Sequence, residues 1–127
     1  MSVQRRLLEL MWRDRQAAQF LGPVSAHTAA EFLLPGGAVA PGWLYLNERG
    51  LVIIGERVPT DPPDDPATNS DRVSFWTWSA LGRVDVQKGV RRRERAVGFA
   101  GLAAQVNVPG NVAEDLLLLS RQFVDAA

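Results

Sequence analysis

The sequence contains no cysteine and only one histidine, His27. Without cysteine, disulfide frameworks, cysteine-ligated zinc, iron–sulfur clusters and thiol catalysis are all excluded. A single histidine also excludes a metal site built from several histidines, and we expect His27 to be an ordinary surface or capping residue. The sequence therefore predicts no metal and no other cofactor.

Long hydrophobic runs are also missing. The longest candidate, residues 97–106, contains two glycines and a glutamine and is about half the ~20 residues that span a bilayer. Arg5 and Arg6 precede an apolar stretch that charged residues interrupt, which differs from a secretory signal. We therefore expect no transmembrane segment and a cytoplasmic protein.

Neither sign of charge is in excess. Lys and Arg total 14, as do Asp and Glu, so the formal net charge is zero. A neutral chain lacks the broad steering field of a nucleic-acid-binding protein, so nucleic acid is an unlikely partner. All basic residues except Lys88 are arginine, a usage typical of a GC-rich bacterial coding sequence. With 127 residues, 46% of them apolar, the chain suits one hydrophobic core.

What the chain does contain begins with a predicted helix over Val3–Leu21, which has no Gly or Pro and ends at Gly22-Pro23. Three roles stay open: packing on the body of the domain, self-association, or a partner or membrane-surface helix. In the last role Trp12 and Phe20 would be the anchors. The arginines that would face phosphates are Arg5, Arg6, Arg13 and Arg15.

The middle of the chain has the composition of strands. Gly42–Leu46 and Leu51–Ile54, joined by Asn47-Glu48-Arg49-Gly50, predict a β-hairpin. Ala26–Leu34 is open to two predictions, a short helix or a first strand that begins at Glu31. The proline- and aspartate-rich stretch 56–72 predicts a solvated loop. Further strands are predicted at Val73–Trp78, Arg83–Gln87, Ala96–Ala100 and Leu102–Val108.

The strand Val73–Trp78 has aromatic residues on both faces. Trp76 and Trp78 share one face with Ser74, and Phe75 lies on the other with Val73. One face is expected in the core. The other is either covered by the N-terminal helix or exposed as a binding surface. The possible interface residues are therefore Trp12, Trp76 and Trp78.

The chain ends with a second predicted helix, from Val112 to Val124. Asn111 is the expected N-cap, with Glu114 three residues on. Val112, Leu116, Leu119 and Phe123 recur at spacings of four, three and four, which makes the helix amphipathic.

The order of these elements resembles the pleckstrin-homology-like superfold, and in particular bacterial PH-like and GRAM-type domains. The resemblance lies in Glu31-Phe32-Leu33-Leu34, Gly42-Trp43-Leu44-Tyr45-Leu46, Arg49-Gly50-Leu51-Val52-Ile53, residues 78–86 and the closing helix. It implies an α+β, mainly β fold: a partly open antiparallel barrel of about six or seven strands, capped by the C-terminal helix. Residues 1–22 form an extra helix, packed on the body or a partner, and residues 31–127 form the PH-like domain.

One cluster of charge stands out, at the expected hairpin reversal: Lys88, Arg91, Arg92, Arg93 and Arg95. Arginine binds phosphate oxygens in bidentate geometry, so the cluster could bind phosphate, anionic lipid or an acidic protein. A solvated hairpin tip is the alternative. In a PH-like fold the usual lipid site involves basic residues near the first hairpin, where this chain offers only Arg49.

No Ser-His-Asp set, phosphate-cradling glycine loop or metal-ligand cluster is visible, so no catalytic residue is assigned. We expect a non-catalytic binding or scaffolding module that works through protein–protein interaction or self-assembly. Peripheral binding to anionic lipid or phosphoinositide through residues 88–95 is the alternative.

Overall fold

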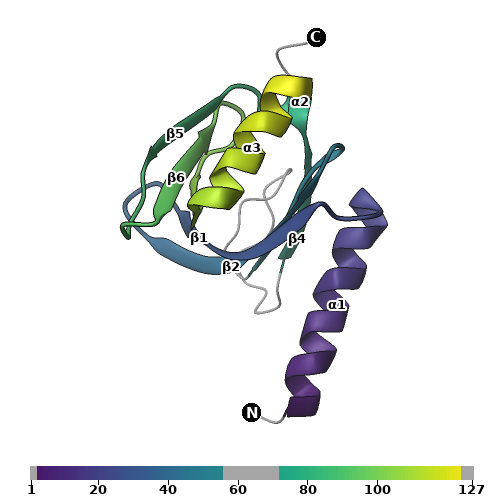
Figure 1. Cartoon of the computed structure of the whole chain (residues 1–127). Helices are drawn as coiled ribbons and strands as arrows, with labels where there is room; N and C mark the ends of the chain where they lie inside the picture. Colours follow the sequence, from purple (N-terminus) through teal and green to yellow (C-terminus); the bar gives the residue numbers. More distant parts are fainter. Residues whose placement is uncertain (1–2, 56–71, 124–127) are drawn as a thin grey trace.

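The computed structural model describes residues 3–55 and 72–123 (Figure 1). Within these ranges the chain forms three helices and seven strands. Their bounds are α1 Val3–Leu21, β1 Ala26–Leu33, β2 Val39–Asn47, β3 Gly50–Gly55, β4 Arg72–Thr77, α2 Trp78–Leu81, β5 Val84–Lys88, β6 Glu94–Phe99, β7 Gln105–Pro109 and α3 Gly110–Phe123. The loop predicted at 56–72 lies outside the described residues, apart from Arg72.

The seven strands form one sheet in the order β4-β3-β2-β1-β7-β6-β5, and every pair of neighbours is antiparallel. The chain thus meanders out from β1 to β4 and returns from β5 to β7, and pairing of β1 with β7 joins the two halves. The sheet does not close, because β4 and β5 are its two edges. This confirms the predicted mainly β fold with a helix at each end, and it is compatible with a PH-like barrel.

The structure of β1 decides between the two predictions for Ala26–Leu34. Residues 26–33 are a strand throughout and pair with β2 from Ala26 opposite Leu46 to Leu33 opposite Val39. The short helix that Ala26–Leu34 also allowed is therefore wrong, and the predicted boundary at residue 31 falls inside β1. The reason is position: β1 pairs with β2 along its whole length and with β7 over Glu31–Leu33, so ladder hydrogen bonds take the place of helical ones.

Smaller differences concern element ends. Residues 78–81, between the strands predicted at 73–78 and 83–87, form a short helix, and the Thr77 side chain caps it by accepting from the Ala80 amide at 3.2 Å. Strand β7 begins at Gln105, three residues later than predicted. Helix α3 begins at Gly110, so Asn111 lies in its first turn and is not the residue before it.

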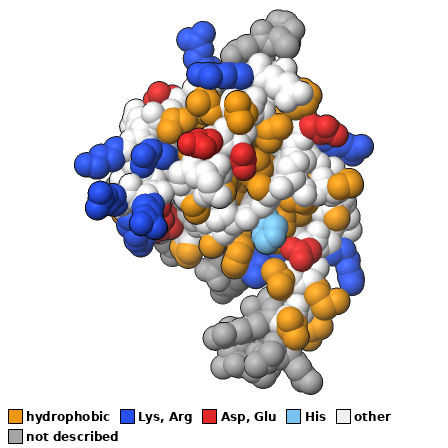
Figure 2. All heavy atoms as spheres, viewed as in Figure 1, with side chains coloured by type: hydrophobic (Ala, Val, Ile, Leu, Met, Phe, Trp, Pro, Cys, Tyr) orange, Lys and Arg blue, Asp and Glu red, His pale blue; other side chains and the backbone are white. Residues whose placement is uncertain are grey.

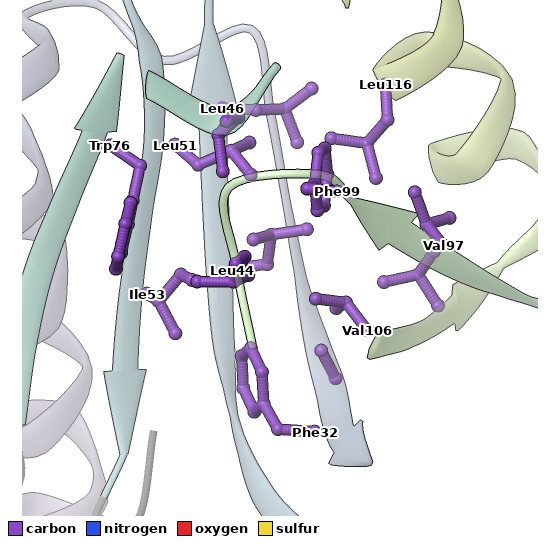
Figure 3. Packing of buried hydrophobic residues seen from close by; sticks show 14 of the residues in the cluster. Phe32, Leu44, Leu46, Leu51, Ile53, Trp76, Val97, Phe99, Val106 and Leu116 are labelled. Carbon is purple, nitrogen blue, oxygen red and sulfur yellow. The ribbon is translucent and has the colours of Figure 1, made fainter. Parts of the chain in front are cut away.

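The main core fills the concave side of the sheet, under α3 (Figures 1 and 3). Side chains from nearly every strand meet there with Leu116 of α3, and all are buried. The largest are Phe32, Leu44, Leu46, Leu51, Ile53, Trp76, Val97, Phe99 and Val106. Burial of each such side chain contributes about 1.5–3 kcal/mol, so this layer is the main stabilising contact of the fold.

A second, smaller core lies on the other face of β2 and β3. Ala17 and Leu21 from the end of α1 pack there against Tyr45, Val52 and Ile54. Helix α1 therefore covers the convex face of one half of the sheet, which settles the alternative left open for the aromatic strand 73–78. Gly22, whose φ is +70°, ends the helix and lets the chain turn into β1.

Candidate functional site

Helix α1 is fixed to the sheet by its second half. Asp14 accepts a hydrogen bond from the Tyr45 hydroxyl at 2.8 Å. The Arg13 guanidinium stands 4.1 Å from the centre of the Trp43 ring, and Phe20 stacks on Phe75 at 5.5 Å. Burial, followed by the bond to Asp14, raises the pKa of Tyr45 to about 12. These contacts fix the direction in which the helix leaves the domain.

Asn47 completes this attachment from the β2–β3 turn. Its buried amide donates to the Leu21 carbonyl at 2.6 Å and to the Pro23 carbonyl at 2.8 Å, while its side-chain oxygen accepts from the Arg49 amide. Two carbonyls at the helix end are thereby satisfied. Asn47 was predicted only as a turn residue, since nothing in its sequence neighbourhood shows that a distant helix ends beside it.

The first half of α1 extends away from the sheet (Figure 1). It carries large exposed apolar side chains. Leu7 is 53% exposed, Leu8 66%, Leu10 36%, Met11 54% and Trp12 41%. We call these five residues the α1 strip. Because Leu7 and Met11, like Leu8 and Trp12, are four residues apart, they form two adjacent rows along the helix.

The same helix surface becomes polar where it passes over the domain. Arg15 and Gln19 continue the row of Leu8 and Trp12, and both are exposed. In the second half of α1 the large apolar side chain that stays exposed is Phe20, at 40%, and its ring stacks on Phe75. The described side chains in the first half of α1 thus form an exposed apolar patch, which makes this surface a candidate interaction site.

Of the three tryptophans predicted as interface residues, only Trp12 lies on the surface. Trp76 and Trp78 are buried in the main core, which removes both as interface candidates. Their ring nitrogens are satisfied inside the chain, by Ser74 at 2.9 Å and by the Asn47 carbonyl at 3.0 Å.

The basic residues gather at the turn between β5 and β6, and blue side chains crowd that side of the molecule (Figure 2). A hollow of about 670 Å³ opens there, lined by side chains that include Lys88, Arg91, Arg92 and Arg95. Arg93 is exposed but does not line it. The structure thus brings four of the five predicted residues together.

Arg91 differs from its neighbours because carboxylates neutralise it. Its Nη1 lies 2.6 Å from Glu31 and 3.1 Å from Glu94. These hydrogen bonds raise the pKa of Arg91, and the bond from Asn107 together with Arg91 lowers the pKa of Glu94. Glu31 and Asn107 were not predicted, because they come from β1 and β7 and reach the turn only through the sheet pairing.

These carboxylates also border a separate hollow of about 710 Å³, lined mainly by residues of β1 and β2. Glu31 and Glu94 both accept from Asn107 and Arg91, so neither is an unengaged acid or base. Among the described residues no group of three or more potential metal ligands occurs. Nor does any helix in the described ranges have the length and apolarity to cross a membrane.

Comparison with known proteins adds a likeness of fold. No family model and no curated protein matches the sequence. Among solved structures, the chain is similar to the C-terminal domain of an unknown protein from Leishmania infantum. The TM-score is 0.50 at 7% identity, over 94% of this chain and 98% of that one. At this identity the likeness concerns the fold alone.

Proposed function

We propose that the protein is a non-catalytic scaffolding module of PH-like, GRAM-type architecture that self-assembles through the α1 strip. The observation that carries the proposal is the uncovered apolar half of a helix whose other half is firmly attached. A loosely held helix could fold back and bury its apolar residues. Here the contacts of Asn47, Asp14 and Arg13 hold α1 in place and keep the strip turned away from the domain.

A second copy of the chain is the occupant that the charges favour. The formal net charge is zero, so two copies meet without long-range repulsion. Two strips packed antiparallel would form a two-fold contact in which each row of leucine, methionine and tryptophan faces its own counterpart. The contact is small, under about 1,200 Å², so we expect a weak, concentration-dependent dimer.

The contacts of α1 also argue against the membrane-surface role considered for this helix. Arg13 lies over Trp43, and Phe20 stacks on Phe75, so one expected phosphate contact and one expected anchor serve the chain's own fold. Both expected anchors stay partly exposed, Trp12 at 41% and Phe20 at 40%, so it is these two contacts, and not exposure, that argue against the membrane-surface role.

The test is the solution mass, measured by light scattering over a range of concentrations at low and high salt. We expect a dimer that persists at high salt, because apolar burial is not screened. Leu8→Glu/Met11→Glu should shift the dimer to monomer, at least tenfold in dissociation constant. Ala18→Glu/Gln19→Glu is the matched control, since it adds the same charge on exposed positions of α1 outside the strip.

A wild-type monomer at every concentration would overturn self-assembly and leave another protein as the occupant. Equal weakening by both double variants would show that added charge alone, and not the strip, disrupts the dimer.

A further inference from the structure

We propose that the hollow at the β5–β6 turn is a binding site for phosphate groups, formed by Lys88, Arg92 and Arg95. All three side chains line the same hollow of about 670 Å³. The site lies on the sheet, away from the α1 strip, and the proposal does not depend on self-assembly.

Among the described residues, the three cations have no negative partner. Within residues 3–55 and 72–123, the only carboxylates in salt-bridge distance of this turn are Glu31 and Glu94, and both pair with Arg91. Lys88, Arg92 and Arg95 therefore keep their full charge toward the hollow. Arg91 is the exception among the basic residues of the hollow. Its ion pairs with Glu31 and Glu94 engage it with the protein itself, so we do not count it as part of the phosphate site.

The sheet register places two of the cations in direct opposition. Lys88, the last residue of β5, pairs with Arg95 of β6, so both side chains leave the same face at neighbouring positions. Like charges at directly opposed positions destabilise a strand pair. An anion bound between them would remove that repulsion, and conflicts of this kind with local stability are expected at functional sites.

The turn that carries the cations is rigidly built. Arg95 donates from Nη1 to the carbonyls of Glu94 at 2.7 Å and Arg92 at 3.3 Å, which holds its guanidinium across the turn. Behind it, Asn107 accepts from the Val90 amide at 3.0 Å, and Glu94 accepts from the Arg91 amide at 3.2 Å. A preformed site loses less entropy when it binds.

The chemistry of the site fits phosphate better than a simple carboxylate. Guanidinium groups bind phosphate oxygens in pairs, and Lys88 adds a point charge. Besides these cations the hollow is lined mainly by aliphatic and backbone groups, with no aromatic ring on which a base could stack. We therefore expect recognition of phosphomonoester or polyphosphate groups, carried by a soluble molecule or by a lipid headgroup.

Two probes distinguish these sources. Tripolyphosphate is titrated into the full chain by calorimetry, and sedimentation is measured with phosphatidylcholine vesicles with and without phosphatidate. The test variant is Lys88→Gln/Arg92→Gln/Arg95→Gln. The control, Arg49→Gln/Arg83→Gln/Arg121→Gln, removes the same charge from exposed arginines elsewhere. Thermal melting of each variant establishes that it is folded.

We expect the wild type to bind at least one probe, the test variant to lose at least tenfold in affinity, and the control to keep most of it. Binding to both probes shows that the phosphate group itself is recognised, whereas binding to phosphatidate vesicles alone identifies a lipid headgroup as the source. The proposal is overturned if the wild type binds neither probe, or if test and control variants lose affinity equally.

Discussion

Strand β3 is buried on both faces, whereas β5, in the other half of the same sheet, is half-buried on one face and exposed on the other. The difference comes from α1, which packs on the convex face of β2–β4. The sequence reflects it directly. Leu51-Val52-Ile53-Ile54 is an unbroken apolar run, while Val84 and Val86 alternate with Asp85 and Gln87. A three-layer half and a two-layer half thus share one sheet.

The largest expected difference between the two halves is the loss of stability caused by a charge on the covered face. Val52 is fully buried between β3 and α1, so Val52→Asp leaves an unpaired charge inside the second core. We expect the free energy of unfolding to fall by about 3–5 kcal/mol. Gln87→Asp, on the uncovered face of β5, should change it by less than about 0.5 kcal/mol. Urea denaturation measures both. Similar losses would mean that α1 does not cover β3 in solution.

We expect the next largest loss of stability from a substitution of Asn47, because this residue attaches helix α1 to the sheet. Asn47→Ala removes two donors from the carbonyls of Leu21 and Pro23, and we expect a loss of about 2 kcal/mol. Hydrogen exchange of the α1 amides should accelerate more than that of β5 and β6. As a control, Asp85→Ala removes only the exposed bond from Gln87. Uniform acceleration throughout the sheet would argue against a local role for Asn47.

Alkaline pH weakens the same layer. The pKa of Tyr45 is about 12 in the folded protein, against an ordinary value of 10. Between these values the unfolded chain loses a proton that the folded protein keeps, so the free energy of unfolding falls as pH rises from about 10 to 12. This is the only tyrosine, so its titration near 295 nm reports on this site alone. Tyr45→Phe should flatten the decline, and a midpoint near 10 would contradict the buried contact with Asp14.

Periodicity predicted most of this fold, since each element's pattern is local. The hairpin around Asn47–Gly50, the strand 73–78 and both long helices follow from residues within a few positions of one another. The β1 assignment stayed ambiguous because Ala26–Leu33 is a central strand whose hydrogen-bond partners come from β2 and β7. Burial of Trp76 and Trp78 could not be predicted for a related reason: aromatic residues on a strand mark a core or an interface equally well.

The candidate sites show the same division between local and distant information. The five basic residues of 88–95 were visible as a cluster, but their roles separate only in three dimensions. Arg91 is neutralised by Glu31, sixty positions earlier in the chain. The α1 strip was likewise visible as apolar spacing. Which half of the helix is covered depends on Tyr45 and Asn47, whose contacts no sequence pattern reveals.

The smallest expected effect is a change of stability in the uncovered half of the sheet, at Lys88 of β5. Lys88→Glu replaces the like-charge pair of Lys88 and Arg95 with an ion pair at exposed positions of β5 and β6. We expect the variant to be more stable than the wild type by about 0.5 kcal/mol, because the repulsion is replaced by a cross-strand attraction. High salt should reduce this gain.

The Lys88→Glu variant should also fail to bind phosphate, since the new carboxylate pairs with Arg95 and repels the anion. A gain in stability together with loss of binding would show that the wild-type repulsion serves a ligand. A variant that is stabilised and still binds phosphate would remove Lys88 from the site.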